Sequence, residues 1–340
     1  MDALIKGSAT DRAEALRQTA AQLGMSEIIV EKDFWVVWSL SRLFALPSFK
    51  DHLIFKGGTS LSKAYSIINR FSEDVDISLD RAHMGFADET DPEHPDISNK
   101  KRKTLLSELQ EVAEQTVAGP LLEELRTDLS KGLGTDCVLD IDPDDAQTLL
   151  FQYPSADTAG GSDYVRPVVR FEFGARGVQL PAGDISIQSY VSEAFPDLLK
   201  NPKTTVRVLA VERTFWEKAT ILHMLHHANP EKTLADRMSR HYYDMAMMID
   251  HDAKSRAMGN LALLEEVAHH KSVFFKAAAA KYEDAKPGTL RLVPTAKLEA
   301  KLRRDYGGMR EMIIGDAPIF DDVLGKIKEF EQEINAATTA

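Results

Sequence analysis

Length and composition set the first limits on this chain. It has 340 residues, 44% of them hydrophobic, which predicts about two domains with sizeable cores. A net charge of −12, from 41 Lys+Arg and 53 Asp+Glu, excludes a broadly basic nucleic-acid binder but not a local basic groove. The single cysteine, Cys137, excludes a disulfide framework and a cysteine-built zinc site. No apolar run or N-terminal leader pattern indicates a membrane or an export route, so we expect a cytoplasmic protein.

The first 210 residues mix helix and strand patterns. Helical periodicity is found in residues 9–24, 26–46, 60–68 and 99–130, the last broken near Gly119-Pro120. Strand patterns are found in residues 53–55, 74–79, 135–141, 147–153, 164–176, 184–191 and 204–209. The polar stretch 81–98 contains two prolines and is expected to be a loop.

From Val211 onward the pattern is almost entirely helical. The periodic runs are 211–227, 235–251, 260–281, 295–306 and 320–336. We therefore predict an α+β domain over residues 1–210 and a mainly helical domain over 211–340 that completes the active site.

The segment FKGGTSLSKAYSIINRFSEDVDISLD, Phe55–Asp80, carries the strongest chemical signal. Gly57 and Gly58 lie between a predicted strand and a predicted helix, where glycine lets the backbone approach a ligand closely. Amides at the following helix start, near Thr59 and Ser60, could hold phosphate oxygens. The turn alone is weak evidence, because many strand–helix turns contain two glycines.

Two aspartates strengthen this hypothesis. Asp74 and Asp76 are two residues apart on a predicted strand, so both carboxylates project from one face. Adjacent carboxylates repel unless a cation lies between them, and Mg²⁺, or Mn²⁺ in its place, prefers such oxygen ligands together with substrate phosphates. The alternative is a solvated edge strand. The combined pattern is typical of a nucleotidyltransferase that holds an NTP at the turn and two metal ions at the acids.

Such a site needs a further acid on a neighbouring strand. In the run 168–173, apolar residues alternate with Arg170 and Glu172. Glu172 is therefore the candidate third ligand, or the base for the incoming hydroxyl group, and Asp184 is the second candidate. The alternative for Glu172 is a surface ion pair with Arg170.

Two residues of the helical half are also candidates. Lys218 is centred on an apolar helix stripe, where an ammonium group must reach water or meet an anion, for which we expect a triphosphate. Asp244 on the next predicted helix could hold Lys218 or a substrate group; the alternative is an intrahelical pair with Arg240. His223, His226 and His227 cannot converge on one helix face, so we expect no zinc site there.

A nucleic-acid acceptor would need a local basic path on this acidic chain. The candidate residues are Lys56, Lys63, Arg70, Lys100–Lys103, Arg213 and Arg240. Lys56, Lys63 and Arg70 flank the glycine turn and the acids, and we also expect them to contact the nucleotide. The run Lys100–Lys103 has a simpler alternative as a solvated helix start.

These segments resemble a known family. The Phe55–Asp80 segment, together with VERTFWEKATILH, SRHYYDMAMM and DYGGMREMIIGDAPIFDDVLGKIKEFEQEIN, is similar to the AbiEii/AbiGii nucleotidyltransferase toxins. The resemblance covers nearly the whole chain. It implies a DNA polymerase β-like nucleotidyltransferase core with a helical C-terminal domain. It also implies a toxin of a type IV toxin–antitoxin or phage-defence (abortive infection) system, encoded beside an antitoxin.

The resemblance also implies roles for particular residues. The glycine turn would bind the triphosphate and the two aspartates the Mg²⁺, while Lys218 matches a lysine that contacts nucleotide phosphates. Asp244 matches the acid of the last motif. His241 stands where many members have an acid, which leaves Asp244 alone in that motif.

The expected reaction is Mg²⁺-dependent transfer of NMP from an NTP to RNA, in particular a tRNA 3′ end, as characterised relatives do. One alternative acceptor is a protein, such as the cognate antitoxin, or a small molecule of the aminoglycoside type. Another is a nucleotide-binding module without turnover, which would have no need of the paired acids.

Overall fold

The computed structural model describes residues 1–72, 74–156, 167–229, 231 and 233–337, and the chain divides into two units. The first unit contains Met1–Ala64, Ser72–Asp91 and Ser98–Leu209. The second contains Tyr65–Phe71, Pro92–Ile97 and Ala210–Ala340. Two short segments of the N-terminal half thus belong to the second unit, which the change of pattern near residue 210 does not reveal.

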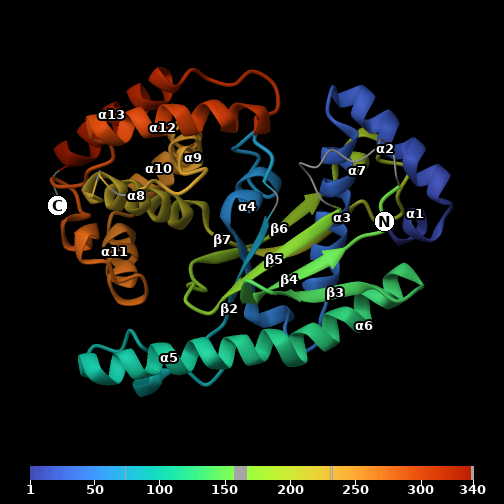
Figure 1. The fold of residues 1–340 in the computed structure, drawn as a ribbon, viewed down its shortest axis with the longest axis horizontal. Helices are drawn as coiled ribbons and strands as arrows, with labels where there is room; N and C mark the ends of the chain where they lie inside the picture. The colour runs from blue at the N-terminus through green and yellow to red at the C-terminus, as the bar shows by residue number, and fades with distance from the viewer. Residues whose placement is uncertain (73, 157–166, 230, 232, 338–340) are drawn as a thin grey trace. The chain divides into compact units, whose positions relative to one another are not determined.

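The first unit is built on a mixed seven-stranded sheet (Figure 1). Its strands are β1 Leu53–Lys56, β2 Asp74–Leu79, β3 Val138–Asp142, β4 Asp145–Gln152, β5 Val168–Gly174, β6 Ala182–Gln188 and β7 Lys203–Leu209. The spatial order is β3-β4-β5-β2-β1-β7-β6. The β2–β5 and β1–β7 pairs are parallel and the other pairs are antiparallel. The predicted α+β class is confirmed.

Helices pack around this sheet. They are α1 Asp2–Lys6, α2 Ala9–Leu23, α3 Glu27–Leu43, α4 Gly57–Lys63, α5 Asn99–Thr116, α6 Leu122–Leu133 and α7 Tyr190–Ala194. A π-helical turn, Val117–Leu121, joins α5 to α6, and Gly119 within it has non-helical dihedral angles at the predicted break. The two helices run one after the other along one side of the sheet in Figure 1, and α6 contacts β3 and α3.

Alternation along the central strands separates an apolar face from a polar face. On β2 the side chains of Val75 and Ile77 are fully buried, whereas those of Asp74 and Asp76 are half-buried on the opposite face. The apolar face packs against α3, whose Trp35 ring lies 6.1 Å from that of Phe151 on β4. The acids therefore point away from the core that fixes their strand.

Several predicted elements differ from the structure. The helix expected over 260–281 ends at Phe274, and α10, Asp252–Met258, was not expected. The helix expected over 60–68 begins at the glycines and ends at Lys63, because the chain then enters the second unit. The strand expected over 184–191 ends at Gln188, where Ser189 caps α7 by accepting a hydrogen bond from the Ser192 amide. Residues 164–166 of another predicted strand lie outside the described residues.

The second unit is helical in its main segment. Its helices are α8 Val211–His227, α9 Ser239–Ile249, α10 Asp252–Met258, α11 Ala262–Phe274, α12 Ala296–Met309 and α13 Phe320–Ala336. Helix α9 contacts α8, α12 and α13. The segment Tyr65–Phe71 is tied into this unit by backbone hydrogen bonds: Phe71 N–H donates to Met312 O and Ile314 N–H donates to Asn69 O. No helix within the described ranges is long and apolar enough to cross a membrane.

Candidate active site

The turn between β1 and α4 lies directly against one of the two acids. Gly57 has φ +76°, and a Cβ atom placed on it would lie 1.9 Å from Asp76 Oδ2. Only glycine fits this position, for its backbone angle and for the space available. The turn backbone and the Asp76 carboxylate are therefore immediate neighbours.

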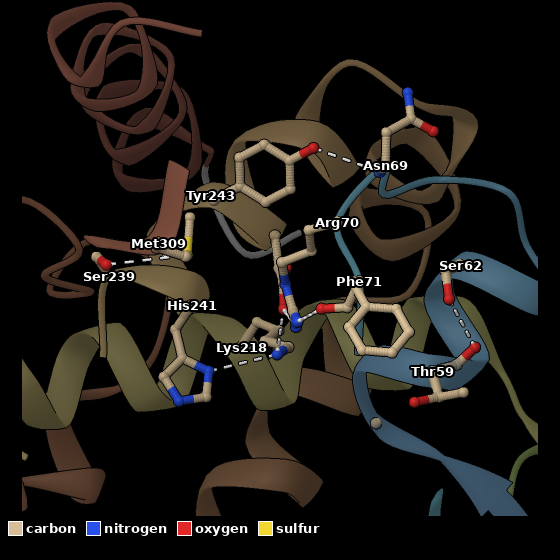
Figure 2. Close-up of polar contacts among 12 residues, drawn as sticks. Thr59, Ser62, Asn69, Arg70, Phe71, Lys218, Ser239, His241, Tyr243 and Met309 are labelled. Atoms are coloured by element: carbon tan, nitrogen blue, oxygen red, sulfur yellow. Dashed lines mark hydrogen bonds and ion pairs between the residues drawn. The ribbon is translucent and has the colours of Figure 1, made fainter. Parts of the chain in front are cut away.

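Hydroxyl groups brace this turn. Thr59 Oγ1 donates to the carbonyl oxygen of Asp74, and Ser60 Oγ donates to the carbonyl oxygen of Gly57 at 2.9 Å. Ser62 Oγ donates in the same way to Thr59 O (Figure 2). The N-cap residue Lys56 makes no side-chain hydrogen bond to the first turn of α4. The hydroxyl groups thus hold the turn in shape, and the first-turn amides are the groups it can offer to a phosphate.

Strand pairing places a third acid beside the first two. In the parallel β2–β5 ladder, Asp76 is paired with Glu172 and Asp74 with Arg170. In the antiparallel β1–β2 ladder, Lys56 is paired with Asp76. Residues paired across a sheet project from the same face. Glu172 therefore lies on the acid face, next to Asp76, as the alternation of β5 predicts.

Arg170 occupies the centre of this face. Its Nε donates to Glu172 Oε1 at 2.8 Å, its Nη1 contacts Asp142 Oδ2, and its Nε lies 3.8 Å from Asp74 Oδ1. The backbone N–H of Asp144 and the Arg170 guanidinium hold the pKa of the Asp142 carboxyl group below its usual value. The alternative of an Arg170–Glu172 pair is thus observed, on the polar face rather than at an unrelated surface.

The donor set of this face fits a divalent cation held by two carboxylates. The carboxylates of Asp74, Asp76, Asp142 and Glu172 share the face with two cationic side chains, Arg170 and Lys56, and the remaining negative charge favours a bound cation. Within the described residues no group of three or more acidic, histidine or cysteine side chains is arranged to hold a metal ion. Asp74 and Asp76 with substrate phosphates remain the set that Mg²⁺ favours.

Asp184, the second candidate for the third acid, lies elsewhere. It is on β6, which is separated from β2 by β1 and β7. Strands are about 4.8 Å apart, so Asp184 is about 14 Å across the sheet from the paired acids. That distance excludes it as a ligand shared with them.

A separate charged cluster lies inside the second unit. Asp244 on α9 is fully buried and accepts from Arg70 Nε at 2.7 Å and Nη2 at 2.9 Å. Lys218 Nζ on α8 donates to the same carboxylate at 2.7 Å. In Figure 2 the Arg70 guanidinium and the Lys218 ammonium group lie close together. The anion that meets the buried Lys218 ammonium is Asp244, and the triphosphate contact stays a prediction.

Two cations, Arg70 and Lys218, share the Asp244 carboxylate of this cluster. Burial disfavours the charged form of Asp244, but Arg70 and Lys218 outweigh that cost and hold its pKa far below the usual value. His241 Nδ1 lies 3.3 Å from Lys218 Nζ. Burial and the neighbouring Lys218 charge lower the pKa of His241 well below its ordinary value, so its ring is neutral and accepts from the ammonium.

Arg70 has a partner in this cluster that the sequence does not predict. It forms a bidentate pair with Asp244, 174 residues away, and the nucleotide contact expected for it stays a prediction. The expected alternative partner of Asp244 was Arg240, four residues away on the same helix. Helix periodicity can suggest that local pair, whereas no sequence spacing indicates the distant one.

Lys63 also has a carboxylate partner inside its own unit. Its ammonium pairs with the buried Asp33 of α3 and lies 3.5 Å from the ring centroid of Tyr190. The Tyr190 amide donates to Asp33 Oδ2 at 2.7 Å. This arrangement ties the end of α4 to α3 and α7. The nucleotide contact expected for Lys63 stays a prediction.

Some residues of the expected basic path are buried and others are exposed. Lys63, Arg70 and Arg213 are buried, so they cannot form an accessible surface for RNA. The lysines at the start of α5 are exposed, namely Lys100, Lys101 and Lys103.

Among the histidines, His223 bonds through Nε2 to Lys281 O and through Nδ1 to the Arg291 amide, each at 3.0 Å.

A glycine turn packed against paired acids on a mixed sheet is typical of the nucleotidyltransferase class. The comparison with family models gives the particular family: residues 38–326 match the family described as "Nucleotidyl transferase AbiEii toxin, Type IV TA system". The chain belongs to this family and is a nucleotidyltransferase toxin of a toxin–antitoxin system, which confirms the resemblance of its motifs.

A solved structure supports the fold. The nucleotidyltransferase toxin MenT4 from Mycobacterium tuberculosis is 15% identical to this chain and superimposes with a TM-score of 0.50. The alignment covers 95% of this chain and 90% of that one. At this identity the similarity establishes the shared fold. A search of curated protein sequences found no match.

Proposed function

We propose that this toxin transfers NMP from an NTP to an RNA acceptor, the 3′ end of a tRNA, with Mg²⁺, or Mn²⁺ in its place, as cofactor. The acceptor hydroxyl group forms a bond to the α-phosphate, the bond between the α- and β-phosphates breaks, and pyrophosphate leaves. One observation carries the proposal: the Gly57 backbone packs against the Asp76 carboxylate, so the phosphate-binding turn and the metal ligands adjoin. The sheet is then a nucleotidyltransferase core of the DNA polymerase β type, followed by a helical domain.

In this proposal the residues of the first unit bind and orient the substrates. Asp74 and Asp76 hold the Mg²⁺, which when bound supplies positive charge at the phosphates. The amides of Gly58, Thr59 and Ser60 bind triphosphate oxygens in a turn already braced by hydroxyl groups. Glu172, next to Asp76 on the same face, accepts the proton of the acceptor hydroxyl group.

For the second unit we propose that Lys218 stabilises negative charge on the nucleotide phosphates and that Asp244 fixes the position of its ammonium. The charges of Arg70 and Arg240, which act on the buried Lys218 ammonium group, support this role because they favour an anion beside it. The expected Arg70 contact with the nucleotide is replaced in this proposal by its pair with Asp244.

RNA is the acceptor class we favour. The exposed lysines at the start of α5 offer a local positive surface on an acidic chain. A protein acceptor, such as a cognate antitoxin, or a small molecule would use the same nucleotide site, so the acceptor is decided by experiment. The chain belongs to an enzyme family, which argues against a nucleotide-binding module without turnover.

The test is incubation of the purified chain with total tRNA, Mg²⁺ and each labelled NTP in turn. The matched control is the Asp74→Asn/Asp76→Asn variant, which keeps side-chain shape and removes both charges. Label on tRNA with the wild type alone supports the proposal and identifies the nucleotide. Label on protein in a lysate, with tRNA unlabelled, contradicts the RNA acceptor. Equal labelling by the variant contradicts the metal site.

A further inference from the structure

Arg170 links the acidic face to a buried anchor. It lies on β5, in the middle of a row of carboxylates that extends from Asp142 at the end of β3 to Asp74 on β2. Its guanidinium reaches across β4 to Asp142, whose side chain is 7% exposed. Asp142 also accepts from the Asp144 amide at 2.9 Å, within the β3–β4 hairpin. Asp142 thus holds the Nη1 side of the Arg170 guanidinium in place.

The other side of the guanidinium contacts Glu172. The Nε–Oε1 distance is 2.8 Å, whereas Asp74 Oδ1 lies 3.8 Å from the same nitrogen, beyond hydrogen-bond distance. The planar fork of an arginine can serve two carboxylates at fixed angles, which a lysine cannot do. Arg170 therefore holds Glu172 in one orientation beside Asp76 and leaves Asp74 outside its hydrogen bonds.

We propose that Arg170, anchored by Asp142, is a positioning residue that orients the Glu172 carboxylate and sets the affinity of the acidic face for its divalent cation. The proposal rests on the metal role of Asp74 and Asp76 argued above. Arg170 offsets part of the negative charge that attracts the cation, and it prevents Glu172 from turning toward the cation site. Asp142 acts in the opposite sense, because it draws the guanidinium toward β3.

Binding of Mn²⁺ to the full-length chain, measured by titrating the electron paramagnetic resonance signal of the free ion, tests the proposal without turnover. Arg170→Gln is expected to lower the Mn²⁺ Kd about tenfold, because one opposing charge is lost. Asp142→Asn is expected to raise it by a similar factor, because a carboxylate is lost and Arg170 can move toward Asp74 and Glu172. A factor of this order is what Coulomb's law gives for one unit charge acting on a nearby divalent ion in water.

A conservative variant separates charge from orientation. Arg170→Lys keeps the charge but not the fork, so its Mn²⁺ Kd is expected to stay within about twofold of the wild type while kcat falls at least tenfold. Arg170→Gln and Asp142→Asn should show opposite changes in Kd. If Arg170 and Asp142 served only to stabilise the sheet, both substitutions would change the Mn²⁺ Kd in the same direction. Both would also lower the melting temperature.

The failures of the two proposals are distinguishable. If Arg170→Gln and Asp142→Asn bind Mn²⁺ like the wild type, while Asp74→Asn/Asp76→Asn does not bind it, the role of Arg170 is wrong and the metal site stands. If Asp74→Asn/Asp76→Asn binds Mn²⁺ as tightly as the wild type, the metal site is wrong, and the role of Arg170 fails with it.

Discussion

The backbone of Gly57 and the carboxylate of Asp76 occupy adjoining space, such that a Cβ atom on Gly57 would lie 1.9 Å from Asp76 Oδ2. This contact joins the first and second parts of the main motif, 19 residues apart in the sequence. It also explains why a residue without a side chain is needed there, since φ is +76° as well. The position of the metal ligand thus depends on the turn.

Gly57→Ala should therefore displace the Asp76 side chain and reduce labelling activity at least 100-fold. The strained backbone angle alone should cost about 1–2 kcal/mol in the free energy of unfolding. The matched control is Gly174→Ala on β5, where a Cβ atom has no neighbour within 4 Å. Full activity in a folded Gly57→Ala protein would contradict the arrangement of the turn and Asp76.

Divalent cations should stabilise the folded chain through the paired acids. At a Mg²⁺ concentration of 100 times Kd, binding adds about 2.7 kcal/mol to the free energy of unfolding. Thermal unfolding in Mg²⁺ and in EDTA measures this shift. The Asp74→Asn/Asp76→Asn variant should unfold at the same temperature in both conditions. An equal Mg²⁺-dependent shift in the variant would place the binding site elsewhere.

Local periodicity predicted those parts of the site that a single strand or turn determines. Alternation along 74–79 gave the strand and its polar face, and alternation along 168–173 put Glu172 on the polar face of β5. Both are local because neighbouring side chains of a strand point to opposite faces. The position of Glu172 beside Asp76 additionally required the parallel β2–β5 pairing, which no local pattern contains.

Contacts between distant segments could not be predicted in this way. Lys63 and Arg70 flank the main motif, so sequence proximity suggested that they contact the nucleotide. In the structure their charges meet Asp33 and Asp244, 30 and 174 residues away. Buried cations need a carboxylate partner, but the sequence does not say which of 53 acidic residues supplies it.

The cluster around Asp244 should respond differently to the loss of its acid and the loss of its lysine. Asp244→Asn leaves Arg70 and Lys218 buried without a counter-charge and should destabilise the chain by about 3–5 kcal/mol. Lys218→Met leaves a balanced Arg70–Asp244 pair, so urea unfolding should change by less than about 1.5 kcal/mol. Labelling activity should nevertheless fall at least 100-fold in Lys218→Met. Retained activity would restrict Lys218 to a structural role.

Stability should decrease as the pH falls below about 6.5, and His241 should be one cause, beside His83, His223 and His227, whose pKa values burial also lowers. The pKa of His241 is depressed in the folded chain by burial and by Lys218, so the unfolded chain binds a proton first. The contribution of His241 to the free energy of unfolding is therefore fully present above pH 6.5. It is lost as the pH falls from 6.5 to the lower pKa that His241 has in the folded chain. His241→Asn offers a carbonyl oxygen to Lys218 and should remove this component. An unchanged pH profile in that variant would mean that other groups cause it.

Salt dependence tests the RNA acceptor on the exposed lysines of α5. Replacing Lys100, Lys101 and Lys103 by Gln should weaken tRNA binding at low salt and reduce the slope of log K against log salt by about 2–3. The control variant replaces three exposed lysines of the second unit, Lys276, Lys286 and Lys328, and tests whether loss of net charge alone produces the effect. Equal slopes for the wild type and the α5 variant would mean that RNA does not contact this surface. Wild-type binding that does not vary with salt would contradict a nucleic-acid acceptor altogether, because phosphate contacts release counterions.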